Sequence, residues 1–491
     1  MKALHNKKAS SHGPYASSVT VHIGVFFDGT GNNRVNSQIG ADCQAMMETY
    51  NNVHSKACAG RHSDPDSSYA NDLTNIAKLA QLYPNQPRAT HDATGFNVHH
   101  SVYVSGVGTT SGGRDSLSGQ GFGRGNTGVI AKVGHGVRKI ADILRTFETH
   151  NPGCVIAGIE FDLFGFSRGA ASARHLANEV LKQRRGAFGE LLTPRKLALS
   201  ADFAWDKGSV RLNVIGLIDT VAAVGGFSDL GNVRDAVNKR VNLFLPPGCA
   251  RQVLHLVAAD ESRRNFALNS IKPHWPKEIV LPGSHSDIGG GYQPQAMESV
   301  ALTRPLRSLV SPCTACETTD AWLQSSALMD TLDTQRWLDP DDPDARVQVE
   351  CTEATGHISG VKRVEACVKM RRRVFGYLSR VYLRVMHALA CDEGVPFRAI
   401  EDARSVGQTE LSLPPELRGI CDKLITHARG QGSGLNEQDL KVLYRRYIHC
   451  SAHWNGLLGA RVKLVESLFF HAPSRNGRQL YPNMGQPGYP E

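Results

Sequence analysis

The chain has 491 residues, of which 41% are hydrophobic and 21% are charged, and it carries a formal net charge of +9 at pH 7. This composition excludes an intrinsically disordered protein and supplies enough apolar residues for a large core with two lobes. The positive charge suits an anionic partner, but no RNA-binding signature and no paired zinc-finger spacing accompanies it, so nucleic acid is not expected. One basic cluster, Lys369–Arg373, is interpreted as the solvated face of a helix.

The N-terminal residues 1–18 are polar and lack the apolar segment of a secretory signal, so we expect a flexible tail there. No run of about 18 apolar residues marks a membrane-spanning helix. We therefore expect a protein that is made in the cytoplasm and is exported, if at all, by another route.

Apolar runs alternate with helical patterns from residue 19 to about residue 300. Such alternation is typical of an α/β fold, here an α/β-hydrolase-like catalytic domain over 19–300, with a mostly parallel sheet and helices on both faces. In such sheets function gathers at the carboxyl ends of the strands. Strands are expected at 19–27, 98–104, 156–164, 212–218 and 278–281, and helices at 73–82, 137–147 and 170–180.

The most informative motif is G-x-S-x-G at Gly165–Gly169, between an apolar strand and a run of small residues at helical spacing. This pattern is typical of a nucleophile elbow, in which a serine sits on a sharp strand-to-helix turn. Gly165 and Gly169 lack the Cβ atoms that would keep the strand and the helix apart. We therefore expect Ser167 to be the nucleophile.

A serine nucleophile needs a base, and the base needs an acid to orient it. Asp219 and His285 follow later strands in the order Ser, Asp, His that an α/β-hydrolase requires. Asp28, Asp162 and Asp287 compete with Asp219 for the acid. Among twenty histidines, His255 in an apolar run is expected to be structural, and His449 and His453, four residues apart, are expected to pack or bond locally rather than bind a metal.

The oxyanion donors are expected to be the backbone N–H of Arg168 and a second N–H from Gly29 or Thr30. Asp28 and Asp287 are alternatives for pinning loops or binding a cation. No cofactor and no metal site is expected, although a divalent cation such as calcium stays open.

Beyond residue 300 the pattern changes. We expect an insertion or linker of uncertain structure over 301–372 and a mainly helical region over 373–491, which could dock a membrane or a partner. The close pair Cys313 and Cys316 has no second pair at zinc spacing, so reduced thiols or later disulfides fit at least as well as a metal. Residues 222–247 are an apolar and basic segment that is either a lid or a packed helix.

Four segments together resemble the type VI secretion phospholipase effectors with a fungal-like hydrolase core: Phe27–Asn33, Gly165–Ala170, Ile218–Val221 and Gly283–Tyr292. The resemblance implies an antibacterial toxin that cleaves phospholipid esters as a phospholipase A, with the same triad of Ser167, Asp219 and His285. It also implies a VgrG-type spike as carrier, delivery into the periplasm of a rival cell, and a periplasmic immunity protein in kin. Residues 301–372 match this family poorly.

Two other functions stay open from the residues. One is a soluble carboxylesterase or thioesterase that uses the same triad on small acyl esters. The other is a non-catalytic binding protein that keeps the hydrolase fold, which an intact triad disfavours.

Overall fold

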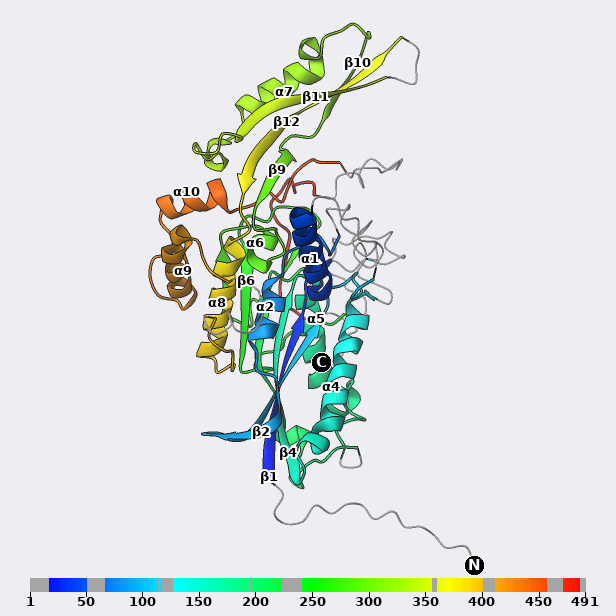
Figure 1. The fold of residues 1–491 in the computed structure, drawn as a ribbon, viewed down its shortest axis with the longest axis vertical. Coiled ribbons are helices and arrows are strands. Elements are labelled where there is room, and N and C mark those ends of the chain that lie inside the picture. The colour runs from blue at the N-terminus through cyan, green and yellow to red at the C-terminus, as the bar shows by residue number, and fades with distance from the viewer. Residues whose placement is uncertain are drawn as a thin grey trace, which may run out of the picture.

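A computed structural model gives the fold of the chain (Figure 1). The structure describes residues 17–50, 67–113, 115, 127–193, 196–222, 241–355, 360–400, 411–456 and 471–485. Its centre is a seven-stranded sheet in the order β2-β3-β1-β4-β5-β6-β8. The strands are β1 Ser17–Phe27, β2 Gln86–Asp92, β3 Gly95–Val104, β4 Cys154–Phe166, β5 Val210–Ile218, β6 Gln252–Ala258 and β8 Glu278–Leu281.

All neighbouring strands of this sheet run parallel except β2, which pairs antiparallel with β3 at one edge. The central strands are near-continuous apolar runs because both faces of a parallel sheet are covered. The register aligns Phe27 with Gly165, and Phe166 with Ile218. The carboxyl ends of β1, β4 and β5 therefore meet at one edge, and the predicted α/β fold is confirmed.

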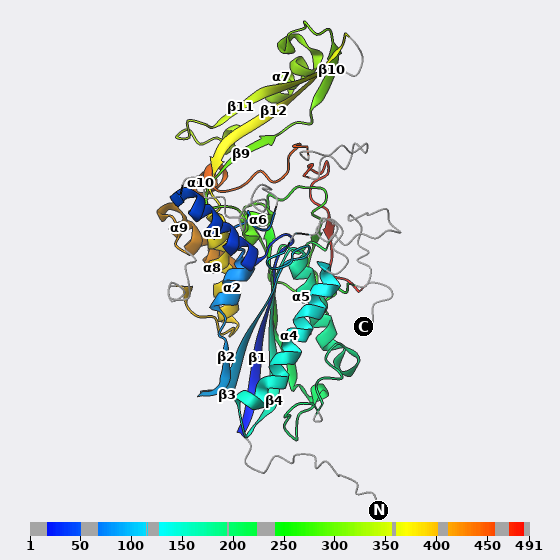
Figure 2. The ribbon, with the colours of Figure 1, turned by 45° about the vertical axis from the view of Figure 1, so that its right-hand side comes forward.

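Helices cover both faces of the sheet, as Figures 1 and 2 show. Helices α2 Asn75–Leu82 and α8 Leu378–Asp392 pack on one face, and α4 Val129–His150 and α5 Arg168–Leu181 pack on the other. Other α-helices in the described part of the chain are α1 Arg34–Tyr50, α6 His285–Gly289, α7 Asp320–Asp330, α9 Pro415–Ala428 and α10 Glu437–Arg446.

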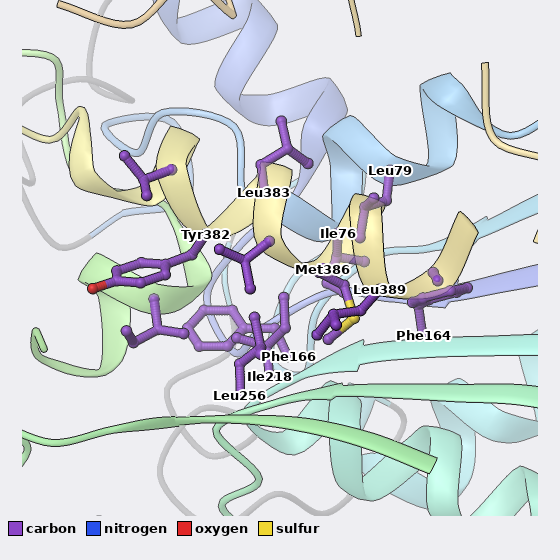
Figure 3. Close-up of a cluster of buried hydrophobic side chains, with 14 of the residues drawn as sticks. Ile76, Leu79, Phe164, Phe166, Ile218, Leu256, Tyr382, Leu383, Met386 and Leu389 are labelled. Atoms are coloured by element: carbon purple, nitrogen blue, oxygen red, sulfur yellow. The ribbon is translucent and has the colours of Figure 1, made fainter. Parts of the chain in front are cut away.

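Helix α8 lies far along the chain from the sheet that it covers. Its apolar face, with Tyr382, Met386 and Leu389, points onto Phe164 and Ile218 of the sheet (Figure 3). All five side chains are nearly or fully buried, and full burial of an apolar side chain of this size contributes about 1.5–3 kcal/mol. The helical C-terminal region thus completes the core beneath the strand ends.

An arm extends beyond the end of the sheet (Figures 1 and 2). It is an antiparallel sheet in which β12 Lys362–Val374 pairs with β11 Arg346–Thr355 along one edge. Along its other edge, β12 pairs with β10 Leu306–Val310 and β9 Ala296–Ala301. Helix α7 packs on one face over a small core that includes Val349, Ala366 and Val368.

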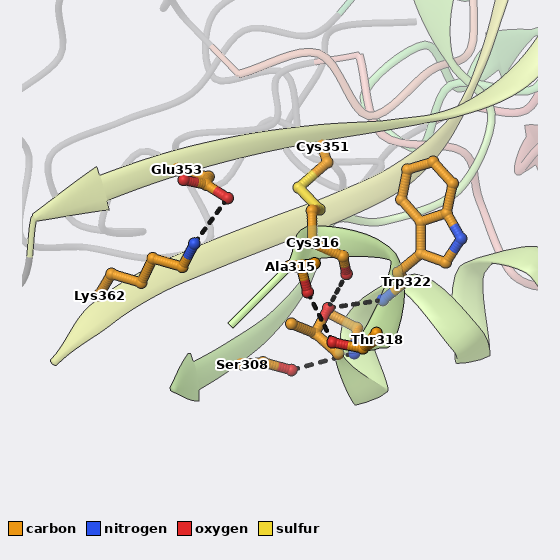
Figure 4. Close-up of a disulfide and its surroundings, with 10 residues drawn as sticks. Ser308, Ala315, Cys316, Thr318, Trp322, Cys351, Glu353 and Lys362 are labelled. Carbon is orange, nitrogen blue, oxygen red and sulfur yellow. Dashed lines mark hydrogen bonds and ion pairs between the residues drawn. A yellow bond between two sulfur atoms is a disulfide. The ribbon is translucent and has the colours of Figure 1, made fainter. Parts of the chain in front are cut away.

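A disulfide braces this arm (Figure 4). It joins Cys316, just before α7, to Cys351 on β11. Cys313 is a free, exposed thiol. Of the alternatives that the sequence left open for Cys313 and Cys316, one cysteine is a thiol and the other forms a disulfide, with Cys351 and not within the pair.

The basic cluster Lys369–Arg373 lies on strand β12, so its interpretation as a helix face is wrong. Arg372 is 1% exposed and donates to Glu298 Oε2 at 2.8 Å and to the carbonyl oxygens of Trp337, Tyr444 and Ile448. A strand places alternate residues on opposite faces, so one arginine of the cluster points inward. Arg372 thereby ties the arm to the region around α10.

The segment proposed as a lid is only partly described. Residues 223–240 lie outside the described residues. Residues 241–246 have no regular secondary structure, and a turn follows at 247–248. Among the helices that the structure describes, none is long and apolar enough to cross a membrane.

Candidate active site

Ser167 lies between the end of β4 at Phe166 and the start of α5 at Arg168. Its backbone has φ 57° and ψ −125°, a strained conformation for a residue with a side chain. A Cβ atom on Gly165 would lie 2.3 Å from the Gly169 oxygen, and one on Gly169 would lie 2.1 Å from the Phe27 oxygen. The two glycines therefore permit the close crossing of strand and helix that an elbow needs.

Asp219 and His285 lie together at the same edge of the sheet. Asp219 directly follows β5 with a positive φ of 43° and is fully buried. His285 is the first residue of α6, and its Nδ1 lies 2.5 Å from Asp219 Oδ2. The imidazole is flanked by the rings of Phe166 and Phe266, with centroids 4.6 and 5.0 Å away. These contacts fix the ring orientation and direct Nδ1 toward the acid.

Ser167 is next to this pair because Phe166, its neighbour in the chain, packs against the His285 ring. Among the described residues no hydrogen bond joins Ser167 Oγ to His285. Such bonds are often long in a site without substrate and tighten when substrate binds. The structure thus brings the three expected residues to one edge of the sheet.

Arg478 is a member of this site that the sequence did not indicate. Its Nη1 and Nη2 atoms lie 2.7 and 2.8 Å from Asp219 Oδ1 and Oδ2, a bidentate ion pair. Ala258 N–H also donates to Asp219 Oδ1 at 3.0 Å. No local pattern marks Arg478, because 259 residues separate it from its partner.

The electrostatics of the site favour an ionised Asp219 and a neutral His285. Burial alone would raise the pKa of Asp219, but Arg478 and His285 outweigh it and hold the pKa below its usual value. Burial lowers the pKa of His285 against the opposing effect of Asp219. A neutral imidazole held by a carboxylate is the state in which histidine accepts a proton.

A second buried ion pair lies beside His285. Glu261 accepts from Arg263 Nη2 at 2.7 Å and from the backbone N–H of His285 at 3.4 Å. Burial would raise the pKa of Glu261, but the charge of Arg263 lowers it to about 2. The opposite charges of Glu261 and Arg263 therefore cancel within the pair.

The loop after β1 supplies the other half of the site. Gly29 N–H donates to Asp28 Oδ1 at 2.7 Å, so it is already engaged. Thr30 Oγ1 accepts from Arg168 Nε at 2.7 Å, which joins this loop to the start of α5. Among the described residues, no hydrogen bond engages Thr30 N–H. Thr30 is therefore a better candidate than Gly29 for the second oxyanion donor.

Asp28 and Asp287 both hold loops. Asp28 also accepts from Thr74 Oγ1 and Tyr103 OH, each at 2.6 Å, and burial raises its pKa. Asp287 caps α6 through Ser284, and its Oδ1 lies 2.7 Å from His449 Nδ1. Over the described ranges, no group of three or more His, Cys, Asp or Glu side chains is arranged to hold a metal ion.

The other histidines that the sequence singled out have structural roles. His255 is buried, with Nδ1 3.0 Å from Glu278 Oε2 and with Nε2 accepting from Thr220 N–H at 3.0 Å. His449 and His453 do not share a helix, because α10 ends at Arg446.

Asp162, a competitor for the role of acid, is buried with Tyr83 and Asn213, each 2.8 Å from its carboxylate. Among the described residues, no hydrogen bond joins Asp162 to His285, so the structure does not place it beside the proposed base.

Residues 193–311 match the family model "T6SS, Phospholipase effector Tle1-like, catalytic domain". No curated protein matches the sequence. A solved structure described as the Tle1 effector bound to the VgrG spike from the Type 6 secretion system is 29% identical. The match covers 95% of this chain and 94% of that chain, with a TM-score of 0.70. An uncharacterized protein from Pseudomonas aeruginosa is 17% identical, with a TM-score of 0.35 over 87% of this chain and 52% of that chain.

Proposed function

The motifs, the family match and the solved structure agree in identifying this chain as a relative of the type VI secretion phospholipase effectors, and from this premise we propose that it hydrolyses acyl esters of membrane phospholipids. The proposed reaction is that of a serine hydrolase of the phospholipase A type. The observation that carries it is the buried His285–Asp219 pair, 2.5 Å apart, at the strand ends beside the strained Ser167.

In the proposed mechanism Ser167 Oγ attacks the ester carbonyl carbon while His285 Nε2 accepts the serine proton. Asp219 holds Nδ1 and stabilises the imidazolium that forms. The backbone N–H groups of Arg168 and Thr30 stabilise the negative charge on the carbonyl oxygen by hydrogen bonds. These two groups belong to elements that the Arg168–Thr30 side-chain hydrogen bond holds together.

The tetrahedral intermediate then collapses. The bond to the alcohol oxygen breaks, and the imidazolium donates its proton to the leaving lysophospholipid. A water molecule attacks the acyl–Ser167 ester, with His285 again as the base, and a fatty acid is released. No step needs a metal ion, so we expect a chelator to leave the rate unchanged.

The biological setting is part of the proposal. A VgrG-type spike would carry the protein into the periplasm of a rival bacterium, and an immunity protein would block it in kin. The similar solved structure is a complex of an effector with a VgrG spike, and this supports the proposed carrier. The disulfide between Cys316 and Cys351 fits an oxidising compartment such as the periplasm.

Release of fatty acid from phosphatidylglycerol and phosphatidylethanolamine vesicles tests the proposal, with a short-chain ester assayed in parallel. We expect release by the wild type and loss of release in Ser167→Ala and His285→Ala. The identity of the freed chain assigns the acyl position. Turnover of the soluble ester that depends on Ser167, without release from vesicles, would leave a soluble esterase. No turnover of either substrate would leave a binding protein.

A further inference from the structure

The last described segment of the chain, residues 471–485, lies against the site and is called the C-terminal strap here. Its strand β13 Leu480–Tyr481 pairs in parallel with β7 Leu268–Asn269. Backbone hydrogen bonds fix it on both sides of this pair, from Ser474 N to Ser262 O and from Asn483 N to Lys272 O, both at 2.8 Å. The strap is therefore attached along its length without the help of Arg478.

Arg478 extends from the strap to Asp219. Its Nε donates to Phe266 O at 2.7 Å, and its two Nη atoms form the bidentate pair with the carboxylate. The arginine side chain is 11% exposed and that of Asp219 is fully buried. With His285 Nδ1 and Ala258 N–H, four donors surround the carboxylate, which matches the roughly four lone-pair sites of its two oxygens.

We propose that Arg478 is a positioning residue of the hydrolytic site, which keeps Asp219 ionised and oriented toward His285, and that the C-terminal strap delivers it. The inference rests on the proposed function, because it gives Arg478 its role through the base. The C-terminal strap thus takes part in the reaction, although Arg478 lies nearly two hundred residues beyond His285 in the chain.

The charges around His285 explain why an arginine is needed. The charged groups that act on the imidazole are Asp219 after β5, which bonds to it directly, and Glu261 and Arg263 after β6, which act on it through space. Arg478 on the strap acts on it through Asp219. Glu261 and Arg263 neutralise one another. Without Arg478, a buried carboxylate would face the imidazole with no other cation to compensate it.

Removal of that charge has two effects with the same sign. Burial would then raise the pKa of Asp219, and an ionised Asp219 without its cation would stabilise the imidazolium and raise the pKa of His285. Both effects reduce the fraction of sites that hold an ionised acid and a neutral base at low pH. The acid limb of the activity profile should therefore move to higher pH.

The test is the rate at which a fluorophosphonate labels Ser167, measured from pH 5 to 9. This reaction uses the nucleophile and its base but needs no phospholipid. The variants are Arg478→Gln, which removes the charge, and Arg478→Lys, which keeps it without the bidentate geometry. Arg475→Gln is the matched control. Arg475 lies exposed on the same strap, and its replacement removes an equal charge.

In Arg478→Gln we expect labelling to fall by roughly ten- to a hundredfold at pH 7, and the acid limb to move up by about one pH unit. Arg478→Lys should keep the wild-type limb and recover part of the rate. Arg475→Gln should match the wild type. A soluble-ester assay should show the loss in kcat and not in KM.

A wild-type profile in Arg478→Gln, or an equal loss in the Gln and Lys variants with an unmoved acid limb, would overturn the inference and leave Arg478 as a strap anchor. Failure of the wild type to label at Ser167 would instead refute the proposed function. Thermal unfolding of each variant separates a loss of rate from a loss of folded protein.

Discussion

Replacing Gly169 by alanine puts a methyl group into the narrowest contact of the elbow. The added Cβ would lie 2.1 Å from Phe27 O and 2.4 Å from Asp28 O, and both atoms belong to the backbone. Ordinary contact begins near 3.4 Å, so α5 and the end of β1 must separate by about 1.3 Å, the difference between 3.4 and 2.1 Å. Overpacking of this kind costs about 1–3 kcal/mol, and we expect the upper part of that range.

The same displacement acts on catalysis, because it moves Ser167 and Arg168 away from the loop that carries Thr30. A misplacement of about 1 Å in a reacting group costs on the order of a hundredfold in rate. We therefore expect Gly169→Ala to unfold at lower urea concentration and to lose about a hundredfold in ester hydrolysis while it remains folded. Denaturant unfolding followed by circular dichroism and a soluble-ester assay give the two values.

Gly419→Ala is the matched control. Gly419 lies inside α9, and apart from its chain neighbours and the backbone of the helix itself nothing lies within 4 Å of the Cβ that alanine would add. Alanine in a helix interior is favoured over glycine by about 0.5–1 kcal/mol, so this variant should gain slightly in stability and keep its rate. Wild-type activity in Gly169→Ala would refute the close crossing of β1 and α5 as the basis of the elbow.

Three other predictions concern stability. Burial raises the pKa of Asp162 to about 6, so the folded state binds this proton more tightly than the unfolded chain, and stability present below about pH 4 is lost as the pH rises through 6. Asp162→Asn should remove this loss and raise the free energy of unfolding at pH 7.5 by up to about 3 kcal/mol. Urea unfolding of the wild type and the variant at about pH 4 and at pH 7.5 measures the effect. The same pH dependence of unfolding in both proteins would contradict the prediction. Arg174→Met should cost about 3–5 kcal/mol in urea unfolding, because the buried guanidinium donates to the carbonyl oxygens of Leu243, Asn269 and Ser270; a loss under 1 kcal/mol would argue against that network. Cys351→Ser should destabilise the arm by about 2–4 kcal/mol, seen as faster amide exchange in α7 and β10–β12, with hydrolysis of a soluble ester unchanged; faster exchange across the central sheet would show that the arm is not a separate unit of stability.

The sequence predicts the parallel sheet because its strands carry a signal of their own. Buried strands appear as apolar runs, and each of the three proposed catalytic residues stands where such a run ends, close to glycine or a polar turn. Parallel pairing then brings Ser167 and Asp219 to one edge without further information. The candidate triad was therefore accessible from local pattern and chain order alone.

Arg478 could not be predicted from local pattern and chain order. The ion pair that it forms with Asp219 depends on the path of the strap across the site, and an isolated arginine in a polar segment carries no periodicity. A long-range contact of this kind is set by the tertiary fold.

The strands of the arm differ from Arg478, because the sequence does contain a local pattern that predicts them. Val347, Val349 and Cys351 alternate with polar residues, and Val364 and Ala366 stand on either side of Glu365. This period of two is typical of half-buried strands, and it predicts β11 and β12. The run of basic residues at the end of β12 concealed it, because such a run is more often found on a solvated surface.

The most direct test of the central claim is the mass of the peptide that contains Ser167 after reaction with a fluorophosphonate. We expect a single adduct on Ser167 in the wild-type protein. In His285→Ala we expect labelling to be slower by about a thousandfold or more, because the serine then has no base. An adduct on a different residue, or equal labelling of Ser167 with and without His285, would show that Ser167 and His285 do not act as nucleophile and base.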